Sequence, residues 1–112
     1  MPDKLTDRFS KISNKIEAAC LQAKRSQNNV RLVAVSKLQS IKVIKEAYAL
    51  GIKNFGENYA QELSEKSLAS PNDIIWHFIG PIQSNKVNLI AKHASWVHSI
   101  DRDKVARKLN AA

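Results

Sequence analysis

The residue whose type and position best suit chemistry is Lys37, which directly follows the apolar run 30–35. A short β-branched run of this kind is typical of a strand buried on both faces, and parallel α/β folds bind ligands at the carboxyl ends of their strands. A partly desolvated lysine amine there is less strongly held in its charged form, so it can attack a carbonyl carbon and form a Schiff base. The alternative is the commoner one, a lysine that ends a strand and extends into water. Position alone leaves both interpretations open.

Two further polar residues follow later apolar runs. Asn58 comes after the run that ends at Phe55, where an amide offers both a donor and an acceptor, although local helix capping accounts for many such residues. Ser99 ends the fourth run and precedes Asp101, for which we expect helix capping rather than acid catalysis. Both positions repeat the placement of Lys37 relative to its run.

His77 lies inside the third apolar run, 74–79. Alternation along a strand places Trp76 and Phe78 on one face and His77 on the other. A histidine that is hydrogen-bonded within the core is the commoner explanation, and a ligand-facing role is the alternative. After the Gly80-Pro81 turn, Lys86 and the free N–H groups of a helix start could hold an anion or form a solvated helix end.

Motifs of several enzyme classes are missing. The chain has no Gly-x-Gly-x-x-Gly, no Gly-x-x-x-x-Gly-Lys-Ser/Thr, no His-Glu-x-x-His and no nucleophile elbow. Dinucleotide-binding, nucleoside triphosphatase, zinc protease and hydrolase functions therefore lose their main support. The single cysteine, Cys20, offers neither an internal disulfide nor a zinc site, which suits a reducing cytoplasm.

The elements that must position these residues alternate along the chain. Apolar residues spaced three or four apart predict a helix from Leu5 to about Ala23. The strands and helices expected after it alternate over 30–35, 41–50, 52–55, 57–68, 74–79, 84–92, 95–99 and 102–109. Gly51 can adopt the left-handed conformation that ends the second helix, and Ser84 can cap the fourth. A helix followed by four βα units demands a parallel sheet with right-handed crossovers.

Two architectures fit this order. A length of 112 residues favours an open doubly wound sheet, because a closed (βα)₈ barrel needs about 250 residues. The pattern of polar residues favours half of such a barrel. In either case the strands end at one rim, so we expect Lys37, Asn58, Gly80 and Ser99 on the same side of the sheet.

The charge balance is basic, with 18 Lys and Arg against 10 acidic residues and a formal net charge of +8. Such a field attracts nucleic acid, anionic membrane or phosphorylated ligands. The basic residues are dispersed over helix surfaces without interleaved aromatic residues, so we expect no nucleic-acid partner. No segment approaches the roughly 18 apolar residues that span a bilayer, and no signal-peptide core is present. We therefore expect a cytoplasmic protein with no membrane partner.

Four segments taken together are more specific than any single residue. In order and spacing they resemble the YggS/PROSC family of pyridoxal phosphate homeostasis proteins over nearly the whole chain. The segments are Ala34-Val35-Ser36-Lys37, then Phe55-Gly56-Glu57-Asn58-Tyr59-Ala60-Gln61-Glu62, then 76–86 (WHFIGPIQSNK), and Val97-His98-Ser99-Ile100-Asp101.

The resemblance implies the amino-terminal half of an alanine-racemase-type (βα)₈ TIM barrel, with residues 1–112 as a single partial domain. It implies pyridoxal 5′-phosphate (PLP) as a Schiff base on Lys37, with Asn58, His77 and Ser99 as further cofactor-binding residues and no metal. The implied role is PLP and vitamin B6 homeostasis without strong catalysis. The alternative is a PLP-dependent amino-acid racemase-like enzyme.

Members of the family are about twice as long as this chain. In barrels of this type the loops after strands seven and eight usually hold the phosphate, and four βα units do not include them. Half a barrel would also leave edge strands unpaired and apolar surface open. We therefore expect a weakened hold on the cofactor and self-association of the half-barrel.

Overall fold

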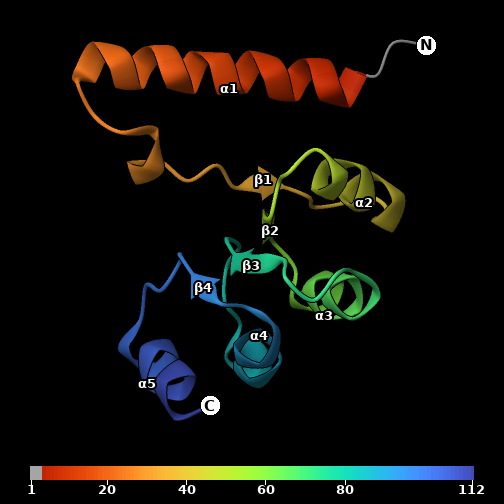
Figure 1. Ribbon diagram of the computed structural model, residues 1–112. Coiled ribbons are helices and arrows are strands. Elements are labelled where there is room, and N and C mark those ends of the chain that lie inside the picture. Colours follow the sequence, from red (N-terminus) through yellow and green to blue (C-terminus); the bar gives the residue numbers. More distant parts are fainter. Residues whose placement is uncertain (1–3) are drawn as a thin grey trace.

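The computed structural model describes residues 4–112 and confirms the alternation of helices and strands (Figure 1). Its elements are α1 (Lys4–Ala23), β1 (Ala34–Val35), α2 (Ile41–Ala49), β2 (Asn54–Glu57), α3 (Ala60–Ala69), β3 (Ile75–Phe78), α4 (Val87–His93), β4 (Trp96–Val97) and α5 (Asp103–Ala111). Short 3₁₀ helices, η1 (Gln27–Asn29) and η2 (Ser84–Lys86), precede β1 and α4. Gly51 follows α2 with φ of +100°, as its position predicts. Among the helices of residues 4–112, none has the length and apolar character that a bilayer span requires.

The four strands form one parallel sheet in the order β1-β2-β3-β4. Neighbours in the sequence are therefore neighbours in the sheet. A doubly wound sheet reverses its strand order at a switch point, whereas a barrel keeps the order sequential. The topology is that of consecutive barrel units, and the carboxyl ends of all four strands meet at one edge, which we call the carboxyl rim.

One face of the sheet packs against helices and forms the core. Phe55, Trp76 and Phe78 are buried on this face, where they meet Leu63 of α3 and Ile90 of α4. Full burial of side chains of this size contributes about 1.5–3 kcal/mol each. The alternation in β3 is confirmed, because Trp76 and Phe78 face the helices and His77 does not.

The opposite face, which we call the inner face, is open at its two outer strands, β1 and β4, and buried at β2 and β3. It carries Val35, Gly56, His77 and Trp96, which are in register across the four strands. Val35 is 54% exposed and Trp96 is 50% exposed, so the expectation that the first strand is buried on both faces was wrong. The radius of gyration is 15.7 Å, against about 13 Å for a compact domain of this length. Half of a barrel explains both observations, because nothing in the described chain covers its interior.

The strand boundaries differ from the sequence prediction in β1, β2 and β4, and β4 spans only Trp96–Val97 instead of 95–99. Pairing of β1 begins only at Ala34, which lies opposite Phe55. The residues from Val30 to Val33 therefore have no ladder partner, although Val30 is extended. The second strand also continues to Glu57, which the sequence pattern assigned to the next helix.

Two expected helix caps are absent. Ser84 begins η2 instead of capping α4, whose N-cap is Lys86 without a side-chain hydrogen bond. Arg102, not Asp101, occupies the N-cap of α5. A cap that the sequence pattern did not single out occurs at Ser40, whose hydroxyl accepts from Val43 N at 3.3 Å at the start of α2.

Candidate functional site

Lys37 lies at the carboxyl rim, in a tight turn that follows β1. Gln39 N donates to Ser36 O at 3.0 Å and closes this turn. The side chain of Lys37 is exposed, and its turn follows Val35, the β1 residue on the inner face. Leu38, the next residue, has φ of 62°, a left-handed conformation that costs a non-glycine residue roughly 1–2 kcal/mol.

A largely buried group of polar residues, which we call the turn anchor, holds this turn from the helix-facing side. It consists of Ser36, Glu57, Glu62 and Lys66. The Lys66 ammonium contacts Ser36 O at 2.7 Å, Glu57 Oε2 at 3.0 Å and Glu62 Oε2 at 2.6 Å. A lysine has three N–H donors, so each of them has an acceptor.

The two carboxylates of the turn anchor attach it to the turn. Ser36 Oγ donates to Glu57 Oε2, and Leu38 N donates to Glu62 Oε2 at 3.0 Å. The hydrogen bond from Lys66, with the bond from Leu38 N and the nearby positive charge, lowers the pKa of Glu62 despite partial burial. Glu62 is therefore held ionised beside the turn. Glu57 is fully buried, and its Oε1 has no partner among the described residues.

Asn58, Gly80 and Ser99 come together at the same rim. Ser99 Oγ donates to Gly80 O, and Gly80 lies so close to Asn58 that a Cβ atom on it would overlap the Asn58 backbone. Asn58 Oδ1 is buried and has no hydrogen-bond partner among the described residues. The parallel topology thus confirms that Lys37, Asn58, Gly80 and Ser99 occupy one rim.

His77 lies deeper on the inner face and is only 2% exposed. Its Nε2 is 2.9 Å from Asn54 Oδ1, and its Nδ1 is 2.9 Å from His98 Nε2. If Nε2 donates to Asn54, Nδ1 must accept from His98, because a neutral imidazole has one donor and one acceptor. Trp96 stacks beside both rings, and Arg31 lies over Trp96 at 5.5 Å from the ring centroid.

The surroundings of His77 predict a pH dependence of stability. Burial, followed by the nearby His98 and the Arg31 charge, lowers the pKa of His77 below its usual 6.5. The unfolded chain therefore binds the proton more readily, and the stabilisation from neutral His77 is present above pH 6.5 and is lost as the pH falls through the lowered pKa. We therefore expect the urea concentration at the unfolding midpoint to decrease as the pH is lowered from 7.5 to 5.5.

The His77→Gln variant tests this assignment. It should be less stable at pH 7.5 and should lose much of the pH dependence between 7.5 and 5.5. A His93→Gln variant serves as the control, since His93 ends α4 and its ring bonds to Ser64 and Ser67 of α3. If the urea midpoint of His77→Gln depends on pH as strongly as that of the wild type, the prediction is wrong.

Sequence reasoning missed the turn anchor and the partners of His77. Lys66 and Glu62 are four residues apart on a helix, a spacing that is ordinarily read as an exposed pair. The available signal was the parity of the second strand, which places Glu57 on the same face as buried Phe55. Asn54 and His98 could not be paired with His77 without the strand register.

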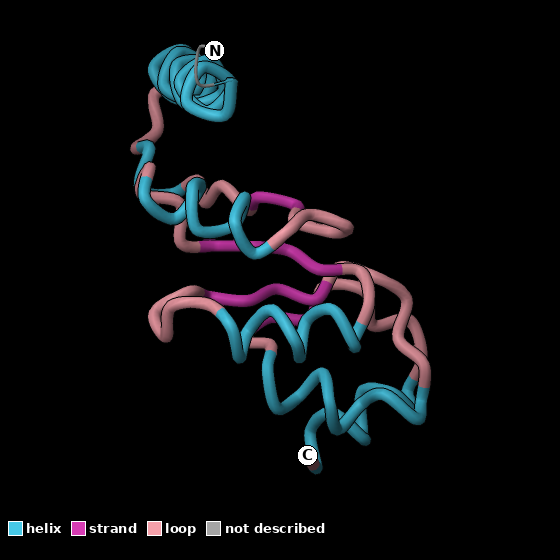
Figure 2. The backbone as a smooth tube through the Cα atoms, turned by 90° about the vertical axis from the view of Figure 1, so that its right-hand side faces the viewer, coloured by secondary structure: helices cyan, strands magenta, loops and turns pink. Residues whose placement is uncertain are grey.

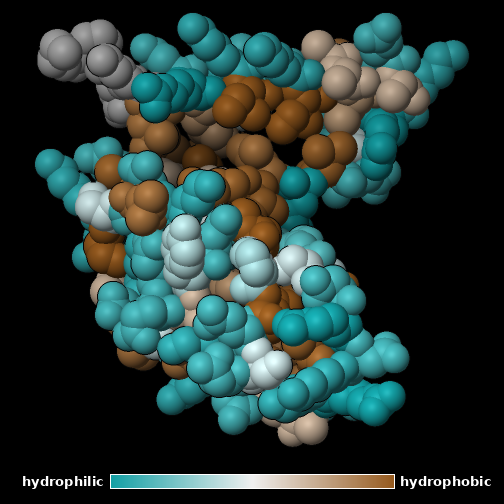
Figure 3. Space-filling view, turned by 180° about the vertical axis from the view of Figure 1, so that it is seen from behind, coloured by the Kyte–Doolittle hydropathy of each residue, from teal (hydrophilic) through white to brown (hydrophobic). Residues whose placement is uncertain are grey.

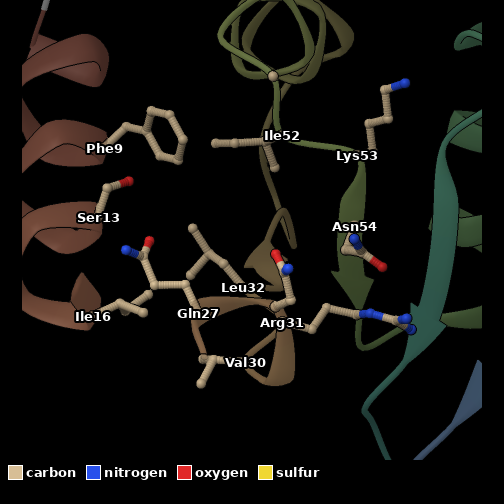
Figure 4. Close-up of a pocket in the computed structure, with 12 residues that line it drawn as sticks. Phe9, Ser13, Ile16, Gln27, Val30, Arg31, Leu32, Ile52, Lys53 and Asn54 are labelled. Carbon is tan, nitrogen blue, oxygen red and sulfur yellow. The ribbon is translucent and has the colours of Figure 1, made fainter. Parts of the chain in front are cut away.

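One cavity lies away from the rim. It has a volume of about 500 Å³ and lies between α1 and the amino ends of β1 and β2, where Phe9, Ser13 and Ile16 of α1 face Ile52, Lys53 and Asn54 (Figure 4). Apolar surface is open in this hollow beneath α1 (Figure 3). A second view shows α1 apart from the other helices (Figure 2). None of the residues predicted to bind a cofactor lines this cavity.

Comparisons with known proteins give a consistent assignment, although no family model matches the chain. The pyridoxal phosphate homeostasis protein of Haemophilus influenzae is 49% identical over 102 residues, which are 88% of this chain and 43% of the relative. The protein of the same name from Pseudomonas aeruginosa is 43% identical over 107 residues, 95% of this chain and 46% of its own length. The chain spans about half the length of the curated relatives it matches.

Solved structures show the same relationship. PipY of Synechococcus elongatus, whose structure has PLP bound, is 36% identical with a TM-score of 0.71, over 86% of this chain and 46% of PipY. A protein of unknown function from Bifidobacterium adolescentis is 29% identical with a TM-score of 0.87, over 96% of this chain and 48% of its own. The chain is thus a homologue of the pyridoxal phosphate homeostasis proteins and corresponds to about half the length of one.

Proposed function

We propose that this chain carries PLP covalently on Lys37, as part of a protein of PLP and vitamin B6 homeostasis. The observation that carries the proposal is the position of Lys37, which is exposed at the carboxyl rim beside an open inner face, in a chain homologous to proteins of that name. When bound, PLP supplies an aldehyde carbon that a lysine amine attacks, with formation of a C=N bond and release of water.

The polar groups at the rim suit a ligand such as PLP. Asn58 Oδ1 is an acceptor without a hydrogen-bond partner in residues 4–112, so a donor on the ligand would satisfy it. Ser99 carries a hydroxyl at the same rim, where it already donates to Gly80 O and retains acceptor capacity. His77 offers only its ring, because both of its nitrogens are within hydrogen-bond distance of Asn54 and His98.

We propose further that the protein does not catalyse reactions of amino acids strongly. The relatives are named for homeostasis. A racemase-like enzyme needs a second base across the cofactor from its lysine, and the rim residues discussed above, Asn58, Gly80 and Ser99, provide none. Interconversion of alanine enantiomers by the purified protein would contradict this part of the proposal.

Borohydride trapping tests the attachment site. The protein is incubated with PLP, reduced, digested and mapped by mass spectrometry. We expect the adduct predominantly on Lys37, with exposed Lys42 and Lys53 as internal references. Labelling spread evenly over the surface lysines would overturn the proposal.

We also propose that residues 1–112 are a single partial domain that self-associates. Within the described residues the sheet ends at β1 and β4, each of which has one unpaired edge, and the inner face exposes Val35 and Trp96. Open edges and exposed apolar surface favour association. Sedimentation velocity should show dimers or larger species at micromolar concentration, and a compact monomer that retains PLP through dialysis would contradict the expectation.

A further inference from the structure

The turn that carries Lys37 has an unusual residue beside it. Leu38 adopts a left-handed conformation, yet its side chain is 78% exposed and so gains little from packing. A disfavoured backbone conformation persists only where the surroundings enforce it, and such conformations gather at functional sites. We therefore infer that the conformation of Leu38 matters for its neighbour, Lys37.

The enforcing contacts come from one side chain and its two carboxylate partners. Lys66 of α3 binds Ser36 O, immediately before Lys37, and Glu62 accepts from Leu38 N, immediately after it. The same ammonium bridges Glu62 to Glu57, which is bonded to Ser36 Oγ. The backbone is thus held on both sides of Lys37, while the Lys37 side chain stays exposed.

The free-energy cost of burying the charged groups of the turn anchor indicates a role other than stabilising the fold. The side chain of Lys66 is 9% exposed and that of Glu57 is fully buried, so both charges have been removed from water. Apolar residues of similar volume often stabilise a fold as well as or better than a buried ion pair does. A buried ion pair whose hydrogen bonds meet at one backbone turn fixes the conformation of that turn.

We propose that Lys66 and Glu62 are positioning residues that orient Lys37 for attack on the aldehyde of PLP, by fixing the turn Ser36–Leu38. This inference rests on the proposed function and adds residues that act through Lys37 without touching the cofactor. It assigns a role to a buried lysine on α3 that is distinct from the role of the reacting amine.

The test measures the ratio of borohydride-trapped label on Lys37 to label on Lys53 within one protein, with folding checked by circular dichroism. We expect Glu62→Ala to lower the ratio several-fold and Lys66→Met to lower it about tenfold, with Lys53 unchanged. Glu62→Gln should keep most of the wild-type label ratio, because the amide oxygen still accepts from Leu38 N. Glu65→Ala is the matched control, an exposed glutamate of α3 whose contact is with Gln61.

Amide hydrogen exchange at Leu38 provides a second readout that needs no cofactor. It should be slow in the wild-type chain and fast in Glu62→Ala. This variant remains informative where Lys66→Met, which leaves Glu57 without its cation, fails to fold. Exchange that stays slow in folded Glu62→Ala, or a wild-type label ratio in it, would overturn the positioning role.

The two proposals fail in different ways. If the wild-type chain labels Lys37 selectively and the variants do too, the positioning role is wrong and the proposed function stands. If the wild-type chain shows no preference for Lys37, the proposed function is wrong, and the role of the turn anchor is then decided by the exchange at Leu38.

Discussion

Lys37→Ala is expected to abolish the PLP adduct that borohydride traps, and with it the absorbance of the C=N linkage, while leaving the fold nearly intact. The amine is the only group that the proposal gives a covalent role. Its side chain is exposed at the end of β1, so its removal creates no cavity and leaves no buried charge unpaired. Surface substitutions of this kind change stability by about 0.5 kcal/mol or less.

Intact mass and the absorbance spectrum after incubation with PLP measure this effect. Lys53→Ala is the control, because Lys53 is also exposed but lies before β2 and pairs with Asp73 at 3.2 Å. The control should keep the full adduct. A Lys37→Ala protein with the same spectrum and labelling stoichiometry as the wild type would assign the linkage to another lysine.

Gly80→Ala is expected to destabilise the protein severely. A Cβ atom at this position would lie 2.7 Å from both Cα and C of Asn58, and these are backbone atoms that no rotamer change can move away. Inserting an extra methyl into a packed region typically costs 1–3 kcal/mol, and a clash with backbone lies at or above the upper end of this range. For a domain near this size, about 3 kcal/mol lowers the melting temperature by more than roughly 10 °C.

Two other glycines provide graded controls, measured by urea unfolding. Gly51 has φ of +100° but nothing within 4 Å of a Cβ atom, so Gly51→Ala should cost only the backbone strain, about 1–2 kcal/mol. Gly56→Ala would place Cβ 3.0 Å from Ile79 Cδ1, the end of a side chain that can rotate, so its effect should be intermediate. If Gly80→Ala unfolds at the same urea midpoint as Gly51→Ala, the loop that contains Asn58 moves to accommodate the methyl group, and the prediction is wrong.

The Gly80 result also bears on the rim. Because Ser99 Oγ donates to Gly80 O and Asn58 packs on the same residue, displacement of Gly80 would separate three of the loops that surround the proposed ligand. Any folded Gly80→Ala protein should therefore show weaker selectivity for Lys37 than the wild type.

Local patterns in the chain were enough to predict the order of the elements and the two faces of the third strand. Helical spacing identified α1 to within a residue at its start, and alternation assigned Trp76 and Phe78 to the core and His77 to the other face. These features depend on backbone periods of 3.6 and 2 residues, so they can be read within a window of the chain. The four segments around Lys37, Asn58, His77 and Ser99 were sufficient to indicate a resemblance to the pyridoxal phosphate homeostasis proteins, and the comparisons bear this resemblance out.

The choice between an open doubly wound sheet and half a barrel required the folded chain, since both have the same local pattern and differ in strand order. The burial of Lys66 also becomes apparent only in the folded chain. Its partner atom on Ser36 lies 30 residues away, and the expected environment of a lysine four residues after a glutamate on a helix is solvent. Pairing of Asn54, His77 and His98 likewise depends on register across three strands. Burial of a polar side chain is a property of everything that packs around it, and for Lys66 that includes carboxylates and a carbonyl that the folded chain brings from β2, α3 and the turn after β1.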